Sequence, residues 1–167
     1  MVHSERIDDE AGLLAYLGRH EIPYQRIVHP PVYTCAEARL YRPPAPGLET
    51  KNLFLRDEKY LFYLVMTDCA KRLDLRRLGK ELGAPKLHFG SEAELMGLLG
   101  LTPGSVTVLG LVNDAKQQVE LLVDAQFWPS PAYLCHPLVN TATLTLDHAA
   151  LLHFFALTGH APRVVEM

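Results

Sequence analysis

The chain has 167 residues, 49% of them hydrophobic, and a formal net charge of −3 at pH 7. This length and composition are typical of one folded domain spanning residues 1–167, and they exclude disordered and fibrous proteins. The acidic balance excludes a protein that binds DNA through a broadly basic surface. One local cluster of cations contrasts with that balance and comprises Lys71, Arg72, Arg76, Arg77 and Lys80.

The cysteines and the N-terminus indicate the cellular compartment of the protein. Cys35, Cys69 and Cys135 are far apart and form no CxxC pair. We therefore expect reduced thiols rather than a disulfide framework or a zinc site. The acidic N-terminus is unlike a signal peptide, and no apolar run approaches the roughly 20 residues of a membrane span. The sequence thus predicts a cytoplasmic protein that has no membrane partner.

The first part of the chain predicts two helices around a strand. An aspartate at position 8 or 9 can cap a helix that runs to about residue 19. Residues 24–28 are typical of a strand, and residues 34–40 fit a short helix. Three prolines within residues 42–47 then require an irregular loop.

The middle of the chain predicts two more strands and two more helices. The strands fall at residues 53–55 and 60–66, and the second is apolar throughout, as in a central strand covered on both faces. Residues 74–82 carry a helical stripe of leucines. Ser91 and Glu94 match a capping box at the start of the next helix.

The last third predicts strands and one closing helix. Residues 105–112 and 119–123 fit two strands joined by a hairpin turn, and residues 141–146 and 163–165 fit two more, around a helix at residues 148–157. We expect an α/β fold, with a mixed, mostly antiparallel, curled or barrel-like sheet of about seven strands and helices packed outside.

Polar residues on three distant segments suggest a site. Lys51 shares a strand face with leucines, so its ammonium must reach water or point into a polar pocket. The Pro-Gly turn before Ser105 can expose backbone donors, and His136 can add an imidazole. Together these groups predict a small site for an anionic ligand.

Other chemistries are poorly supported. No GxSxG motif surrounds Ser105, and the histidines show no HxxxH or HxH spacing, so we expect neither a serine nucleophile nor a metal or other cofactor. Cys135 and His136 are adjacent in an extended segment and point to opposite faces, which prevents a thiol dyad. A basic helix face could be solvated surface or could contact nucleic acid, and it comprises Arg72, Arg76 and Lys80.

Five segments, in order, resemble the YbaK/prolyl-tRNA synthetase-associated domain family of trans-editing aminoacyl-tRNA deacylases. They are HPPV at 29–32, TKNLFL at 50–55, GLTPGSVT at 100–107, GLVND at 110–114 and HPLVNTAT at 136–143. Within the family the chain most resembles the free-standing alanyl-tRNA(Pro) deacylases. The resemblance extends from about residue 8 to 165. It implies hydrolysis of the ester between a wrong amino acid and the 3′ adenosine of tRNA(Pro).

The resemblance also implies candidate catalytic and substrate-binding residues. Lys51 would hold the phosphate of the terminal adenosine, and Asn52 would steady the same region. Gly104 and Ser105 would bring backbone groups to the ester and the attacking water. His136 would shape the amino-acid pocket.

The resemblance implies further contacts with the tRNA, and the chain departs from the family pattern at one position. Asn140 would contribute to substrate binding, and Arg72, Arg76 and Lys80 would contact the tRNA backbone. Val108 stands where the domains inserted within prolyl-tRNA synthetases have a proline, which bears on the stiffness of this loop and on the amino acid accepted.

A size argument explains why such an enzyme is needed. One methylene in an apolar pocket is worth only about 1–3 kcal/mol, so a synthetase pocket for proline cannot fully reject alanine. A second, smaller pocket can admit alanine and exclude proline. A positioned water with backbone oxyanion donors is sufficient for the ester, and the resemblance implies assistance from the 2′-hydroxyl of the tRNA.

Several alternatives remain open. The mischarged amino acid could instead be cysteine, serine, threonine or 2-aminobutyrate. The chain could be a non-catalytic module that binds tRNA ends or a synthetase, or a protein that binds a small anion. The expected partner is the acceptor end of aminoacyl-tRNA(Pro), and prolyl-tRNA synthetase is a second candidate.

Overall fold

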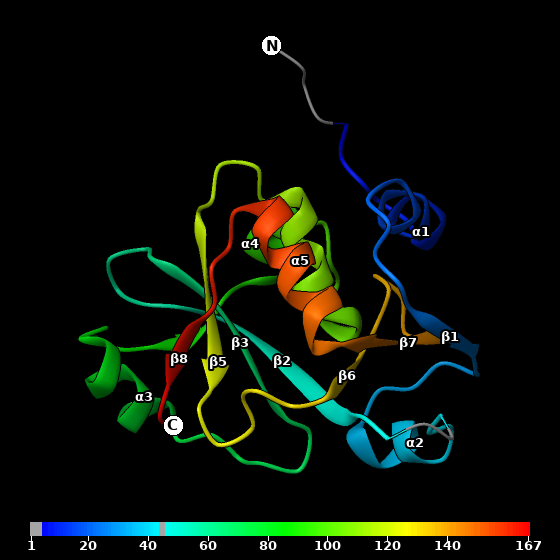
Figure 1. Cartoon of the computed structure of the whole chain (residues 1–167). Helices are drawn as coiled ribbons and strands as arrows, with labels where there is room; N and C mark the ends of the chain where they lie inside the picture. The colour runs from blue at the N-terminus through cyan, green and yellow to red at the C-terminus, as the bar shows by residue number, and fades with distance from the viewer. Residues whose placement is uncertain (1–4, 44–45) are drawn as a thin grey trace.

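The computed structural model describes residues 5–43 and 46–167, and Figure 1 shows their arrangement. Within these ranges the α-helices are α1 (Glu10–Arg19), α2 (Cys35–Arg39), α3 (Leu75–Leu82), α4 (Glu92–Leu99) and α5 (His148–Thr158). The strands are β1 (Gln25–Val28), β2 (Leu48–Arg56), β3 (Phe62–Asp68), β4 (His88–Phe89), β5 (Val119–Asp124), β6 (Ala132–Cys135), β7 (Ala142–Asp147) and β8 (Arg163–Val165). The predicted single domain includes residues 1–4, and the predicted proline loop includes residues 44–45. Both stretches lie outside the described ranges.

The described strands form one mixed sheet. Their order is β1-β7-β6-β2-β3-β5-β8, with β4 paired to β2 outside this path. Four pairings are antiparallel, and the β2–β6, β3–β5 and β5–β8 pairings are parallel. The expected mixed α/β fold is confirmed. Because β1 and β8 end the path without pairing to each other, the sheet is open rather than a closed barrel.

The core lies on both faces of the sheet, as the apolar run in β3 predicts. Leu64 and Met66 belong to a large buried cluster that includes side chains of α1, α4 and α5. Tyr63 and Val65 point to a smaller cluster that includes α3 and the end of the chain. Side chains alternate along a strand, so a strand buried on both faces must be apolar at every position.

The helix boundaries follow from local capping. The Asp9 carboxylate accepts from the backbone N–H of Gly12 at 2.8 Å and begins α1. Ser91 and Glu94 form the predicted capping box of α4. Gly83 ends α3 with φ of 62°, a left-handed conformation that glycine adopts at little cost.

The strand β2 determines where the polar residues meet. Its pairing with β3 sets Lys51 opposite Thr67, and its parallel pairing with β6 sets Glu49 opposite Leu134. Since β6 ends at Cys135, His136 follows directly beyond the strand that neighbours β2. The cation therefore lies on β2, and the imidazole directly follows the strand next to it.

The predicted strand at residues 105–112 and its hairpin with residues 119–123 are wrong. The segment forms two 3-10 helices, η1 (Pro103–Ser105) and η2 (Val108–Asn113). Thr107 Oγ1 accepts from the backbone N–H of Leu109 at 3.2 Å, a local bond that competes with a sheet ladder. At Gly110 a Cβ would lie 2.6 Å from the side chain of Leu101, so the turn packs directly on the core.

Two strands were not expected, β4 and β6. They have two and four residues, respectively, and both are too short to show a periodic signal. Among the residues that the structure describes, no helix has the length and apolar character that a membrane crossing requires.

Candidate active site

A small cavity of about 160 Å³ opens beside the first half of β2. Its walls come from β2, from α2 and the residues around it, from η1, and from the segment that follows β6. Of the residues predicted from the sequence, the cavity is lined by Lys51, Asn52, Gly104 and His136. These residues come from three segments that are distant in sequence, and the structure brings them together.

Lys51 contributes a partly desolvated cation. It is half-buried on the cavity wall. Burial lowers the pKa of the Lys51 ammonium, although the negative charge of Asp68 opposes that shift. An ammonium with an incomplete water shell gains more from binding an anion than a fully hydrated one does.

Asn52 connects β2 to η2, which follows the turn that carries Gly104. Its Oδ1 accepts a hydrogen bond from the backbone N–H of Val108 at 2.9 Å. This bond fixes the start of η2 against the strand that holds Lys51. The side chain therefore positions backbone as well as lining the cavity.

Gly104 and Ser105 differ in their access to the cavity. Gly104 is exposed on the wall, and a Cβ there would lie 3.7 Å from the ring of Tyr33 and 4.0 Å from Nδ2 of Asn140. Ser105 is buried, and its backbone N–H donates to Thr102 O at 3.0 Å. Only Gly104 of this pair lines the cavity.

Asn140 lies behind the wall rather than on it. Its Nδ2 donates to the carbonyl of Val32 at 3.1 Å, and the N–H of Val32 donates to the Asn140 carbonyl at the same distance. These two bonds clamp the loop after β6 to the segment that leads into α2.

The imidazole of His136 has a defined tautomer. Its Nδ1 lies 3.1 Å from the carbonyl of Ala142, which can only accept, so Nδ1 carries the proton and Nε2 is an acceptor. Burial lowers the pKa of His136, the bond to Ala142 opposes this, and the neighbouring His29 lowers it further. The ring is therefore neutral at neutral pH.

The predicted basic residues lie elsewhere. Arg72, Arg76 and Lys80 are exposed and do not line the cavity. Arg76 and Lys80 border a separate groove along α3, together with Lys59 and Lys86.

The sequence interpretation missed two features of the cavity wall. Tyr33 is 73% exposed at the wall, and only its place directly after the HPPV motif could have suggested it. Glu49 is a carboxylate just 16% exposed, whose oxygens lie 3.0 Å from Nε of Arg39 and 3.4 Å from Nε of Arg42. Nothing in the sequence pattern indicated that pairing.

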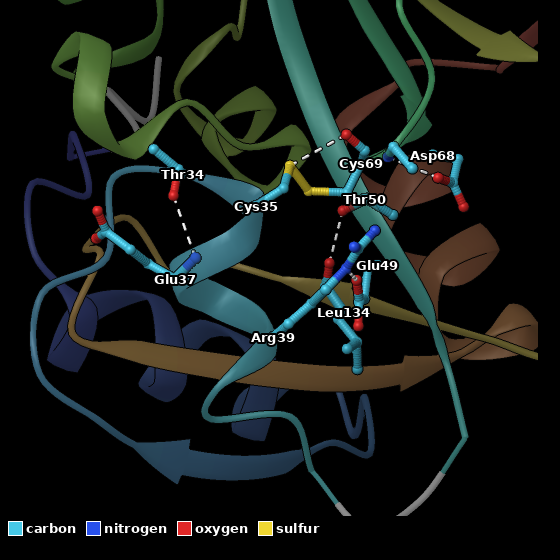
Figure 2. Close-up of a disulfide and its surroundings, with 10 residues drawn as sticks. Thr34, Cys35, Glu37, Arg39, Glu49, Thr50, Asp68, Cys69 and Leu134 are labelled. Carbon is cyan, nitrogen blue, oxygen red and sulfur yellow. Dashed lines mark hydrogen bonds and ion pairs between the residues drawn. A yellow bond between two sulfur atoms is a disulfide. The ribbon is translucent and has the colours of Figure 1, made fainter.

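The expectation of reduced cysteines is wrong for two of the three. Figure 2 shows a disulfide between Cys35, at the start of α2, and Cys69, just beyond β3, with Cα atoms 5.8 Å apart. Thirty-four positions separate them, and only the tertiary fold makes them neighbours. Cys135 is buried and unpaired, and burial raises the pKa of its thiol to about 12. It is therefore protonated at neutral pH and cannot supply a thiolate nucleophile.

Comparison with known proteins identifies the family. The family model of the aminoacyl-tRNA editing domain matches residues 29–154. The chain is 33% identical to prolyl-tRNA editing protein ProX of Acetoanaerobium sticklandii, over 96% of this chain and 99% of that protein. It is 34% identical to prolyl-tRNA synthetase associated domain-containing protein 1 of Danio rerio, over 96% of this chain and 88% of that one. A solved structure described as a candidate trans-editing enzyme for prolyl tRNA synthetase shares the fold, with a TM-score of 0.71 at 20% identity over 96% of this chain and 99% of that one.

The chain therefore belongs to the aminoacyl-tRNA editing domain family. The protein is an aminoacyl-tRNA deacylase, as its resemblance to the trans-editing enzymes indicated.

Proposed function

We propose that the protein acts in trans on mischarged tRNA(Pro) and that alanyl-tRNA(Pro) is its preferred substrate. The observation that carries this proposal is the single cavity shared by Lys51, Gly104 and His136. The names of the relatives, a prolyl-tRNA editing protein and prolyl-tRNA synthetase associated proteins, support tRNA(Pro) as the carrier.

Lys51 and Tyr33 hold the terminal nucleotide in this proposal. The half-buried ammonium of Lys51 binds a phosphate of the tRNA 3′ end. The exposed ring of Tyr33 offers a face on which the terminal adenine can stack, since every base has a π-face that an aromatic side chain can cover. Both contacts orient the ester without touching the amino acid.

Hydrolysis then needs only a positioned water. The water oxygen bonds to the ester carbonyl carbon, and the backbone N–H of Gly104 stabilises the oxyanion. The bond to the ribose oxygen breaks, and that oxygen takes the proton that the attacking water loses, relayed by the neighbouring ribose hydroxyl. Since the Ser105 N–H already donates to Thr102, we assign the oxyanion contact to the turn at Gly104 rather than to Ser105.

Size decides which ester is cleaved. The imidazole of His136, neutral and fixed by Ala142, forms one wall of the amino-acid pocket. We infer that the part of the cavity beside His136 admits the methyl group of alanine and not the ring of proline. Correctly charged tRNA(Pro) is then spared, as exclusion by a second, smaller pocket requires.

The remaining contacts concern the body of the tRNA. Arg72, Arg76 and Lys80 lie outside the cavity, where phosphates of the acceptor stem can reach exposed cations. Asn140 supports the pocket from behind through Val32. We also propose that the chain is a single cytoplasmic domain, because the cytoplasm is where tRNA is charged for translation. Prolyl-tRNA synthetase, the enzyme that would produce the mischarged ester, is a second proposed partner.

Deacylation assays with purified tRNA(Pro) test the proposal. Alanyl-, seryl-, cysteinyl- and prolyl-tRNA(Pro) are compared at equal concentration, with hydrolysis in buffer subtracted. Alanyl-tRNA(Pro) should be cleaved fastest and prolyl-tRNA(Pro) slowest. Preferred cleavage of cysteinyl- or seryl-tRNA(Pro) would overturn the specificity. Absence of turnover on every ester would favour a binding module.

A further inference from the structure

One wall of the cavity is a helix that the core does not hold. α2 has five residues, none of them buried. Cys35 and Ala38 of α2 line the cavity, and Tyr41 and Arg42 extend the wall beyond its end. A helix of this length is not stable alone, so its position depends on its attachments to the rest of the fold.

The attachments of α2 to the strands β2 and β3 are few. Arg39, and Arg42 just after the helix, pair with Glu49, and both arginines are more than half exposed. Glu49 is only 16% exposed, so solvent screens these two ion pairs mainly from the side of the arginines, and they hold α2 more weakly than a covalent link does. The covalent link from Cys35 to Cys69 is thus the strongest attachment of α2 to these strands.

The disulfide lies at the active site. Both cysteines line the cavity and are half-buried, so a small thiol can reach them. The backbone N–H of Cys69 donates to the carbonyl of Glu49 at 2.7 Å, two residues before Lys51 on β2. Figure 2 shows the disulfide between Cys35 of α2 and Cys69, with Glu49 and Thr50 of β2 drawn beside it. Any change at this bond acts directly on the wall of the cavity.

We propose that Cys35 and Cys69 form a redox modification site, whose reduction by a dithiol releases α2 and switches the deacylase to a less active, less selective state. A thiolate of the dithiol attacks one cysteine sulfur and forms a mixed disulfide, and the other cysteine leaves as a thiolate. The second thiol of the reductant then attacks the reductant's own bonded sulfur and frees the first cysteine. Two electrons pass to the protein, which gains two thiols, and the dithiol becomes a cyclic disulfide.

The consequence follows from the geometry. With the bond intact, α2 is fixed and the cavity keeps its size. After reduction, the described residues hold this wall through the ion pairs to Glu49, the bonds between Val32 and Asn140 and the stacking of Tyr41 on His29, none of them covalent. The small ester is then positioned less well, and a larger amino acid meets less resistance. The effect on turnover rests on the proposed editing function, whereas the release of α2 does not.

Hydrogen exchange and thiol labelling test the release without any substrate. Dithiothreitol should make Cys35 and Cys69 available to a maleimide and should speed amide exchange in residues 33–42 by roughly tenfold. The variant with Cys35→Ser and Cys69→Ser should exchange at the faster rate with or without dithiothreitol. The inference is overturned if exchange in residues 33–42 is the same in both redox states, or if the double variant still responds.

Turnover provides the second measurement. For alanyl-tRNA(Pro), kcat/KM should fall by roughly tenfold on reduction, and its ratio to the value for prolyl-tRNA(Pro) should also fall. The double variant should show the reduced values throughout. Unchanged kcat/KM in the presence of faster exchange would overturn the switch. No turnover in either redox state, with exchange still responsive, would overturn the proposed function and leave the modification site standing.

Discussion

The side chain of Asn52 accepts a hydrogen bond from the backbone N–H of Val108 at 2.9 Å. This bond joins the strand that carries Lys51 to the start of η2, the segment that follows the turn of Gly104. A proline at position 108 could not donate it, because proline has no backbone N–H. The valine at this position therefore allows a connection that a proline would remove.

Asn52→Ala should weaken this connection with little effect on the rest of the fold. Loss of one such bond costs about 1 kcal/mol in the free energy of unfolding. We expect faster amide exchange at Val108 and a drop of roughly tenfold in kcat, because the turn no longer keeps its distance from Lys51. Asn52→Asp retains an acceptor, so it should restore protection of the Val108 amide. An unprotected amide in Asn52→Asp would contradict this assignment.

Lys51→Ala should remove the anchor of the terminal phosphate. We expect kcat/KM to fall at least about 100-fold, because the ester is no longer held against the water. The fold should persist, since Lys51 is only half-buried, and circular dichroism can check this. Lys116→Ala is the matched control, since Lys116 is exposed in the turn between η2 and β5, away from both the cavity and the groove along α3. Equal loss in both variants would argue against a specific role for Lys51.

Tyr33→Ala should raise KM and leave kcat nearly unchanged. Stacking of one base on an aromatic ring is worth about 1–3 kcal/mol, so KM should rise by roughly tenfold. Tyr60→Ala is a suitable comparison, because Tyr60 is 64% exposed and packs against Arg56 away from the cavity. Rates at saturating and at low substrate separate the two parameters. A fall in kcat alone would mean that Tyr33 acts on the ester rather than on the base.

His136 should make stability depend on pH. Burial lowers the pKa of His136 in the folded protein below the ordinary value of about 6.5 that applies when the chain unfolds. Between these two pKa values the unfolded chain binds more protons, so the free energy of unfolding falls as the pH drops below about 6.5 and is unaffected above it. Urea denaturation at several pH values should show a shallower fall for His136→Gln. Identical pH profiles for variant and wild type would contradict the buried neutral ring.

Much of the fold could be predicted from local patterns. Helix starts at Asp9 and Ser91 depend on side chains that bond their own first turn, and the apolar run in β3 reports burial on both faces. The predicted strand at residues 105–112 is wrong, because a run of β-branched and apolar residues fits a strand and a tightly packed 3-10 segment equally well. The choice between them depends on Leu101, Asn52 and the core, which local sequence does not contain.

The sequence by itself determined which chemical groups are available: one cation on a strand, a Pro-Gly turn, an imidazole and no convincing nucleophile. Only the tertiary structure decided which of them share a cavity, because the register of β2 against β3 and β6 joins segments that are far apart in the chain. It left Arg72, Arg76 and Lys80 outside and brought Cys35 to Cys69 across 34 positions. Side-chain chemistry is local, whereas proximity between distant residues is a property of the whole packed chain.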